Sequence, residues 1–193
     1  MTDNVDNVDK VDKEALRGVE VATWERPKLV RLWDWRERFV EWIVDAWDKS
    51  RRLQYGDTSE ELQGPNGYSF SWDPTKGHNC LTLASTSCLI ITGVDLHDRF
   101  SPIPYTSEVE AYMAMRKLGF KNVDQLLESL FPEIELNHTL TGDLLTVGTP
   151  NEAGDQIVRA AAIADPPFFW AMTPSGLGRG RLEDAMAAYA VAR

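Results

Sequence analysis

One cysteine stands where a nucleophile could be placed. The stretch KGHNCLTLASTSCLIITG, residues 76–93, puts Cys80 directly after a polar turn and at the start of an apolar run of helical length. Asn79 is a typical N-cap and Gly93 a typical residue after a helix end, so the pattern predicts a buried helix between them. Because free N–H groups and the helix dipole favour a thiolate at a first helical turn, we expect the pKa of Cys80 to be lowered.

A cysteine hydrolase also needs a histidine within hydrogen-bond reach of the thiol. The chain has three histidines, at positions 78, 97 and 138. His78 precedes Cys80 by two residues, and it is either a base that folds back onto the thiol or a residue that anchors the loop. His97 follows the far end of the predicted helix, about 20 Å from Cys80 by helix rise. The sequence does not indicate where the side chain of His138 points.

The other candidate sites give weak signals. Cys88 lies about 12 Å from Cys80 along a helix, which is too far for a disulfide, so we expect two free thiols and a buried Cys88. Both thiols fit a reducing compartment. No C-x-x-C pair accompanies the histidines, so the sequence predicts no metal and no cofactor. The segment PSGLGRGR, residues 174–181, lacks the order of a phosphate-binding loop and is expected to be a flexible surface loop whose arginines pair with an acidic neighbour.

Composition limits the classes of partner. The chain has 193 residues, 43% of them hydrophobic, which is enough for one domain with an additional arm. A net charge of -10 argues against binding to nucleic acid or to anionic lipid. The apolar runs are too short to span a bilayer, and the acidic N-terminus has no apolar signal core. We therefore expect a protein made in the cytosol with no membrane span.

The N-terminal half reads as an arm, a helix and a loop. Residues 1–12 repeat NVD, and residues 1–32 are predicted to be an arm that is either flexible or docked on a partner. Residues 34–53 form an amphipathic helix pattern with an aromatic buried face, and Asp34 and Glu37 have capping-box spacing. Residues 55–77 are rich in Gly, Pro, Asp and Ser, which predicts a long loop that serves a contact or covers a site.

Helices and then strands follow the central helix. A capping box starts one predicted helix at Ser107, which stops at Gly119, and a second begins at Asn122 and stops before Pro132. The runs TGDLLTVG, DQIVRAAAIAD and PFFWAMT predict a meander of antiparallel strands. The last segment, residues 181–193, has helical composition at first but could equally close the sheet as an edge strand. The pattern predicts an α+β fold with the sheet packed on the buried central helix.

From residue 34 to residue 193 the chain resembles the small NlpC-like papain-fold proteins that tailed phages encode beside their tail-tip genes. The resemblance rests on the order of HNC, TGVD, EAYMAMRKLGF and GDLLTV. It implies a papain-like fold for residues 33–193, with Cys80 at the position of the nucleophile and Gly142-Asp143 at the GD pair that starts the first strand of the sheet. It also implies a catalytic histidine on the next strand, facing the cysteine.

The sequence departs from this pattern at the histidine. The matching strand is DQIVRAAAIAD, residues 155–165, and no histidine follows His138. Gln156 and Arg159 are the only non-acidic polar residues of this strand, and neither is a general base at neutral pH. The Cys-His pair cannot form in the way that the resemblance implies.

Three hypotheses follow. The first is a structural component of a bacteriophage tail tip or hub, a virion protein made in the host cytoplasm, with a papain-like fold that has lost peptidase activity and contacts other tail proteins through its N-terminal segment and the 55–77 loop. The alternative is an active cysteine peptidase that cuts peptidoglycan during cell-wall penetration, with Cys80 as nucleophile, His78 or His138 as base and backbone N–H groups as the oxyanion site. The third is a cytosolic binding module of host origin with an unknown ligand.

Overall fold

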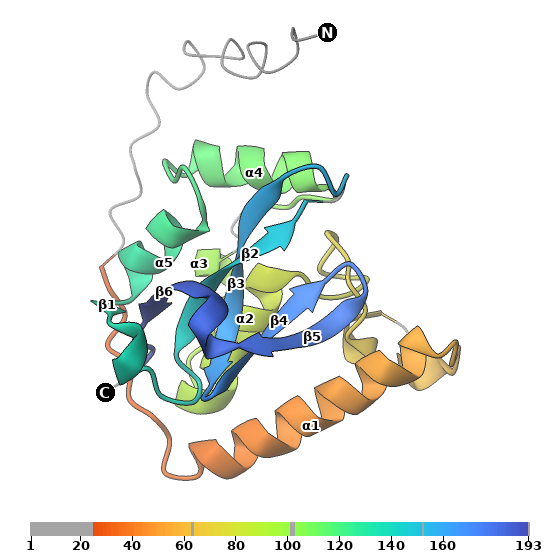
Figure 1. The fold of residues 1–193 in the computed structure, drawn as a ribbon, viewed down its shortest axis with the longest axis horizontal. Coiled ribbons are helices and arrows are strands. Elements are labelled where there is room, and N and C mark those ends of the chain that lie inside the picture. The colour runs from red at the N-terminus through yellow and green to blue at the C-terminus, as the bar shows by residue number, and fades with distance from the viewer. Residues whose placement is uncertain (1–24, 63, 101–102, 152, 193) are drawn as a thin grey trace, which may run out of the picture.

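The order of the elements is helices first and strands second. The structure, a computed structural model, describes residues 25–62, 64–100, 103–151 and 153–192. Within this part of the chain, five α-helices are followed by a six-stranded antiparallel sheet (Figure 1). The fold class is therefore α+β, as the sequence pattern predicts.

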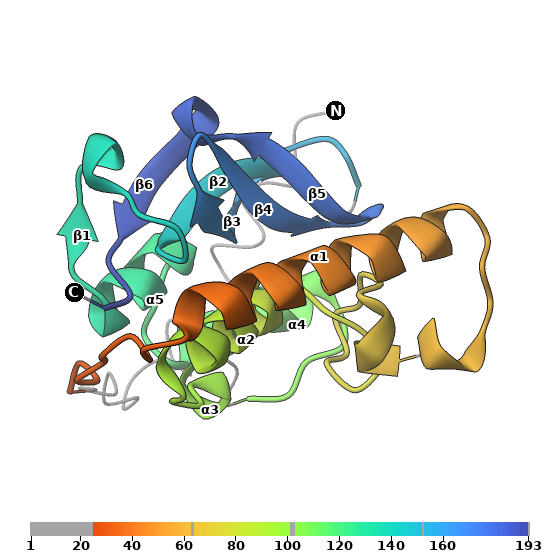
Figure 2. The ribbon, with the colours of Figure 1, turned by 90° about the horizontal axis from the view of Figure 1, so that it is seen from below.

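The two longest helices form as predicted. Helix α1, Trp35–Gln54, buries one side that includes Phe39, Ile43 and Ala46. Helix α2, Cys80–Thr92, is enclosed on most sides and packs against α1 and against the sheet (Figure 2). Its first turn is closed by a capping box, because the side chain of Asn79 accepts from the N–H groups of Leu81 and Thr82. It ends at Gly93, whose φ of +74° is a conformation that glycine adopts without strain.

Three shorter helices continue the layer. They are α3, His97–Phe100, α4, Glu108–Lys117, and α5, Val123–Leu130. Ser107 and Asn122 cap the N-termini of α4 and α5 with their side chains, as predicted. Short 3-10 helices lie at Glu60–Leu62 (η1), Gly64–Gly67 (η2), Leu136–His138 (η3) and Leu182–Asp184 (η4).

The sheet has the order β1-β6-β2-β3-β4-β5. The strands β2, β3 and β4 form the predicted meander, with Thr146 opposite Ala161 and Ile163 opposite Trp170. The bounds are β1 Glu133–Ile134, β2 Leu144–Pro150, β3 Ile157–Asp165, β4 Phe168–Thr173, β5 Gly176–Arg181 and β6 Ala185–Tyr189.

The sheet is strongly curled. Strand β5 is at one end of the strand order and β6 is next to the other end, yet only the three residues of η4 join them. So short a connection requires the two ends of the sheet to approach each other. The concave layer is filled by small side chains, because Ala162, Ala164 and Ala188 are buried there beside Leu145. Figure 2 shows the curled sheet on one side of the two long helices.

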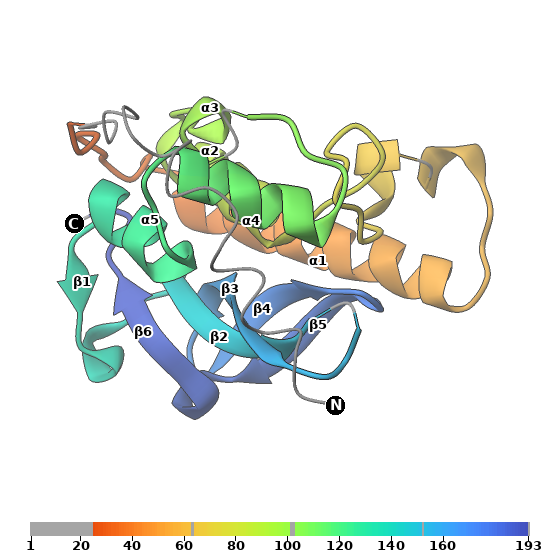
Figure 3. The same ribbon diagram turned by 90° about the horizontal axis from the view of Figure 1, so that it is seen from above.

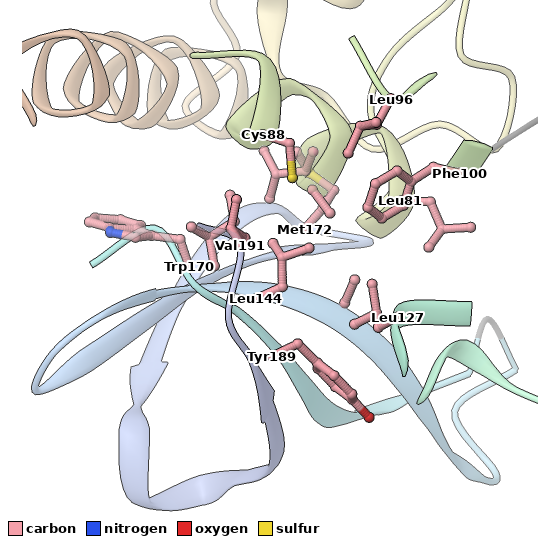
Figure 4. Close-up of a cluster of buried hydrophobic side chains, with 14 of the residues drawn as sticks. Leu81, Cys88, Leu96, Phe100, Leu127, Leu144, Trp170, Met172, Tyr189 and Val191 are labelled. Carbon is pink, nitrogen blue, oxygen red and sulfur yellow. The ribbon is translucent and has the colours of Figure 1, made fainter. Parts of the chain in front are cut away.

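The main core lies between the helices and the sheet. Leu81 and Cys88 of α2 project toward Leu144 of β2 and Met172 of β4, and Val191 closes the layer after β6 (Figure 4). Cys88 is fully buried, as expected for a small apolar side chain in the centre of the core.

Three local predictions are wrong. The segment 174–181 is not a flexible loop, because residues 176–181 form β5. The expected pairing with an acidic neighbour is present for Arg181, which contacts Glu183 at 2.9 Å, whereas the guanidinium of Arg179 lies over the ring of Phe168. The C-terminal strand β6 is not an edge strand, because it lies between β1 and β2. Asp34 precedes α1 without a side-chain capping bond.

The end of the predicted arm that the structure describes packs on this chain. Residues 1–24 lie outside the described residues. The N–H group of Leu32 donates to the carbonyl of Ile91 at 2.9 Å, and Arg31 donates to the carbonyls of Thr141 at 2.7 Å and Ala192 at 3.2 Å. No helix in the described ranges has both the length and the apolar character needed to cross a bilayer.

Candidate functional site

A small pocket opens beside Cys80, where α2 begins against β3. Residues reach it from the loop before α2, from the first residues of α2 and α4, from the end of β2 with the following turn and β3, and from the end of β4. Its lining is mostly apolar and consists of Phe70, Trp72, Cys80, Glu108, Thr149, Pro150, Asn151, Val158, Arg159, Ala160, Met172 and Pro174. The long loop at residues 55–77 therefore borders the cysteine through two of its aromatic side chains, Phe70 and Trp72.

The thiol of Cys80 is held among backbone groups. The backbone N–H groups of Ala161, Leu81 and Cys80 itself are near enough to stabilise a thiolate, but burial has the larger effect and raises the pKa of Cys80. The expected lowering of this pKa is therefore wrong. Its physical cause is that the first turn of α2 is covered by β3 and the loop, so that desolvation outweighs the helix terminus.

Strand β3, on which the resemblance implies a catalytic histidine, has an alanine next to Cys80. It is Ala161 of β3 whose backbone contacts the thiol, and its side chain has no titratable group. Two residues earlier, Arg159 directs its guanidinium to Asp124 of α5 at 2.5 Å. The pKa of Cys80 is shifted by burial and by backbone N–H groups, and no histidine of the described residues contributes to the shift.

His78 has well-defined contacts within its loop. Its ring stacks on Tyr68, with the ring centroids 4.6 Å apart and the planes within 5°. The backbone N–H group of His78 donates to the carbonyl of Ser69 at 2.8 Å, and its backbone carbonyl accepts from the N–H group of Ser71 at 2.9 Å. These contacts match the loop-anchoring alternative, while the role of His78 as a base stays a prediction from sequence.

The other two histidines lie in short helices outside the pocket lining. His97 begins α3, and its backbone N–H group donates to the carboxylate of Asp95 at 2.8 Å. His138 ends η3 and is exposed, and its backbone N–H group donates to the carbonyl of Glu135 at 2.9 Å. The structure therefore does not bring the three histidines together with Cys80 in one pocket.

The Gly142-Asp143 pair has a structural explanation. Gly142 has a φ of +85°, and a Cβ atom there would lie 2.3 Å from Cδ1 of Ile91. Asp143 is fully buried, contacts Arg31 at 3.1 Å and accepts from the N–H groups of Leu140 and Val191. This carboxylate therefore joins the segment before α1 to the segment before β2 and the segment after β6, at a place that does not line the pocket.

A second polar cluster was not found from the sequence. Asp124 accepts from the hydroxyl of Thr146 at 2.7 Å and from Tyr189 at 3.4 Å, in addition to its pair with Arg159. Burial, followed by the charge of Asp124, raises the pKa of Tyr189, so its hydroxyl stays protonated and donates. In the sequence this cluster is marked only by Asp124 in the first turn of α5. An acidic residue at that place is common, because it interacts favourably with the helix dipole, so it does not predict a cluster.

The site thus combines a half-buried cysteine with an arginine, Arg159, that is already engaged in an ion pair. Across the described ranges, no three His, Cys, Asp or Glu side chains gather where they could hold a metal ion. The thiol has backbone donors, and among the described residues no titratable side chain contributes to the shift of its pKa.

A family model, described as a domain of unknown function (DUF6950), matches residues 30–191. The chain belongs to this family. The DUF6950 match begins just before α1 and continues past the end of β6, so it includes every helix and strand described above. No curated protein and no solved structure gives a significant match to the chain.

Proposed function

We propose that this DUF6950 protein is a structural component of a bacteriophage tail tip or hub, with a papain-like fold that has lost its peptidase activity. The tail location rests on the resemblance in the order of the motifs. The loss of activity is supported by one observation above all: the β3 residue in contact with Cys80 is Ala161, which cannot accept a proton.

The layout of the elements is compatible with this proposal. Cys80 begins the central helix, and the strand after Gly142-Asp143 starts the meander on which that helix packs. A peptidase would use a histidine on β3, whereas this chain uses Arg159 of β3 in an ion pair with Asp124 of α5. A strand position that could serve catalysis therefore contributes to holding α5 on the sheet.

A substitution in the phage genome that encodes the chain tests the proposal. We expect the protein in purified particles, and we expect phage carrying Cys80→Ala to assemble and infect as the wild type does. A phage that lacks the gene should produce defective tails. Absence of the protein from particles contradicts the tail assignment, and loss of infectivity in Cys80→Ala phage with normal particle yield contradicts the loss of activity.

The alternative is an active cysteine peptidase that cuts peptidoglycan. It is favoured by the backbone N–H groups of Ala161, Leu81 and Cys80 around the thiol, because such donors can stabilise an oxyanion. Incubating the purified chain with peptidoglycan and analysing released peptides by mass spectrometry tests it, with Cys80→Ala as the control. We expect no release by either protein; release by the wild type alone would establish the peptidase.

A further inference from the structure

The outer side of α1 carries an apolar line that none of the described residues covers. Trp33, just before the helix, is 94% exposed, and Val40 and Val44 are 51% and 60% exposed. Val40 and Val44 are four residues apart, so they lie on one side of the helix, and Trp33 lies in the turn that precedes it. This side adjoins the side that carries the buried residues Phe39 and Ile43, and its own valines are exposed, so it contributes little to the core.

A row of carboxylates borders this line. Glu37, Glu41, Asp45 and Asp48 are exposed along the same part of α1, and Asp45 is partly neutralised by Lys49 at 2.8 Å. We call the set Trp33, Glu37, Val40, Glu41, Val44, Asp45 and Asp48 the α1 outer face. It is apolar along its centre and acidic along one border, and its four carboxylates outnumber the exposed Arg36 and Arg51 beside the same line, which suits a partner helix that is apolar and basic.

The outer side of α4 has the complementary character. Val109, Tyr112 and Met113 are exposed by 68%, 39% and 46%, and Arg116 and Lys117 follow them. These five residues define the α4 outer face. The guanidinium of Arg116 lies over the ring of Tyr112, 4.9 Å from its centroid. The face is therefore apolar at its start and basic at its end.

The acidic residue at the start of α4 is used locally. The carboxylate of Glu110 accepts from the N–H group and the hydroxyl of Thr106, at 2.7 and 2.8 Å. These bonds hold it at the helix start, away from the basic end. Charge repulsion from Glu110 therefore affects an acidic partner less than the attraction of Arg116 and Lys117 does.

The two faces lie on opposite sides of the molecule. Figure 1 places α4 at the upper edge and α1 at the lower edge. Seen from below, α1 lies in front of α4 (Figure 2), and seen from above, α4 lies in front of α1 (Figure 3). Two complementary faces on opposite sides cannot pair within one chain. They can pair between copies.

We propose that the protein self-associates head to tail, with the α1 outer face of one copy docked on the α4 outer face of the next. Such a contact joins different surfaces, so it leaves a free face at each end and extends into a ring or an open chain. The α1 face cannot pair with itself in the same way, because two rows of carboxylates would meet. The self-association is independent of a tail location, and it would hold for either function of the site.

The size of the contact predicts its strength. Helix α4 is about 15 Å long, so it covers about half of α1. One such helix pair falls short of the roughly 1,200 Å² that stable interfaces bury, and the net charge of -10 opposes close approach of two copies. We therefore expect a weak, concentration-dependent association that becomes stronger when a ring closes and each copy is held at both faces.

Sedimentation velocity over a wide concentration range tests the proposal with the full chain. The α1 variant carries Val40→Ser, Glu41→Lys and Val44→Ser, and the α4 variant carries Val109→Ser, Met113→Ser and Arg116→Glu. We expect the average mass of the wild type to rise with concentration and that of each variant alone to stay at the monomer value. All changes are at exposed positions, and unchanged thermal unfolding would show that both variants fold.

Mixing the two variants gives the sharpest result. Each variant keeps one intact face, so a head-to-tail contact predicts that an equal mixture forms a dimer of one copy of each and nothing larger. Ile157→Ser is the matched control, because Ile157 is 72% exposed on β3 and belongs to neither face. This variant should associate as the wild type does.

Four results would overturn the proposal. They are a wild type that stays monomeric at every concentration, an α4 variant that dimerises alone through its α1 face, an α1 variant that associates as the wild type does, and a mixture of the two variants that stays monomeric. A wild type that stays monomeric but binds a synthetic helical peptide with a leucine line bordered by lysines would show that the α1 outer face serves a different protein.

Discussion

Burial and hydrogen bonding act in opposite directions on the thiol of Cys80. Three backbone N–H groups favour the thiolate, and desolvation disfavours it more strongly, so the pKa of Cys80 is raised. A catalytic cysteine in such a place needs a histidine to compensate, and the contacting residue on β3 is Ala161. The residue that begins α2 therefore has the position of a nucleophile without the chemistry of one.

The largest effect of a single polar substitution is expected at Asp143. Asp143→Ala removes a fully buried carboxylate that pairs with Arg31 and accepts from the N–H groups of Leu140 and Val191. Because these donors would be left without an acceptor, we expect the free energy of unfolding to fall by about 3–5 kcal/mol. Urea denaturation measures it.

The matched control for Asp143 is Asp45, which pairs with Lys49 on the surface of α1. Because exposed pairs one helical turn apart contribute little, Asp45→Ala should lower the free energy of unfolding by no more than about 0.5 kcal/mol. Similar losses for the two variants would contradict the role assigned to the buried carboxylate.

At the scale of elements, α1 is fastened to the edge of the sheet. The hydroxyl of Ser50, which is buried, accepts from the N–H group of Leu177 at the start of β5, at 2.8 Å. Gly176 allows this approach, because a Cβ atom there would lie 2.5 Å from the same hydroxyl oxygen. The open edge of β5 is thus covered by α1 where the strand begins.

Removing this hydroxyl should weaken the attachment. Ser50→Ala leaves the N–H group of Leu177 buried without an acceptor, so we expect a loss of about 1–2 kcal/mol in the free energy of unfolding. Hydrogen exchange at Leu177 should also become faster. Ser129→Ala is the control, since the hydroxyl of Ser129 bonds only within its own helix. An unchanged exchange rate at Leu177 in Ser50→Ala would refute the attachment.

The elements that sequence predicts well are those with local causes. Asn79, Gly93 and Ser107 cap helices through neighbours a few residues away, so their patterns can be read along the chain. The glycines of residues 174–181 predict a flexible loop, whereas Gly180 is required for packing, because a Cβ atom there would lie 2.2 Å from the ring of Phe169. The pKa of Cys80 was beyond sequence for the same reason, because its burial comes from Ala161 and the loop with Trp72, which meet only in the fold.

At the scale of the whole molecule, the curled sheet depends on small side chains. Ala162, Ala164 and Ala188 fill the concave layer and are almost fully buried. The three residues of η4 that connect β5 to β6 require the two ends of the sheet to lie close together. Larger side chains in this layer would push those ends apart. The run of alanines in β3 is therefore a requirement of the fold rather than a sign of helical structure.

Enlarging one of these alanines tests the curl. Ala162→Leu adds volume to a layer in which the side chain is almost fully buried, so we expect the free energy of unfolding to fall by about 1–3 kcal/mol. Ala153→Leu, at an exposed position, should change it by less than about 0.5 kcal/mol. Thermal unfolding of the two variants distinguishes these effects, and equal stability would mean that the concave layer has room for larger side chains.

The pH dependence of Cys80 alkylation tests the central claim most directly. The reactive form is the thiolate, so a raised pKa means that the thiolate fraction at any given pH is below that of an ordinary cysteine. Reaction with iodoacetamide, followed by peptide mapping to separate Cys80 from Cys88, should be slow at pH 7 and should accelerate only above the ordinary cysteine pKa of about 8.5. A rate at Cys80 that reaches its half-maximum below that pH would contradict the account and point to an active nucleophile.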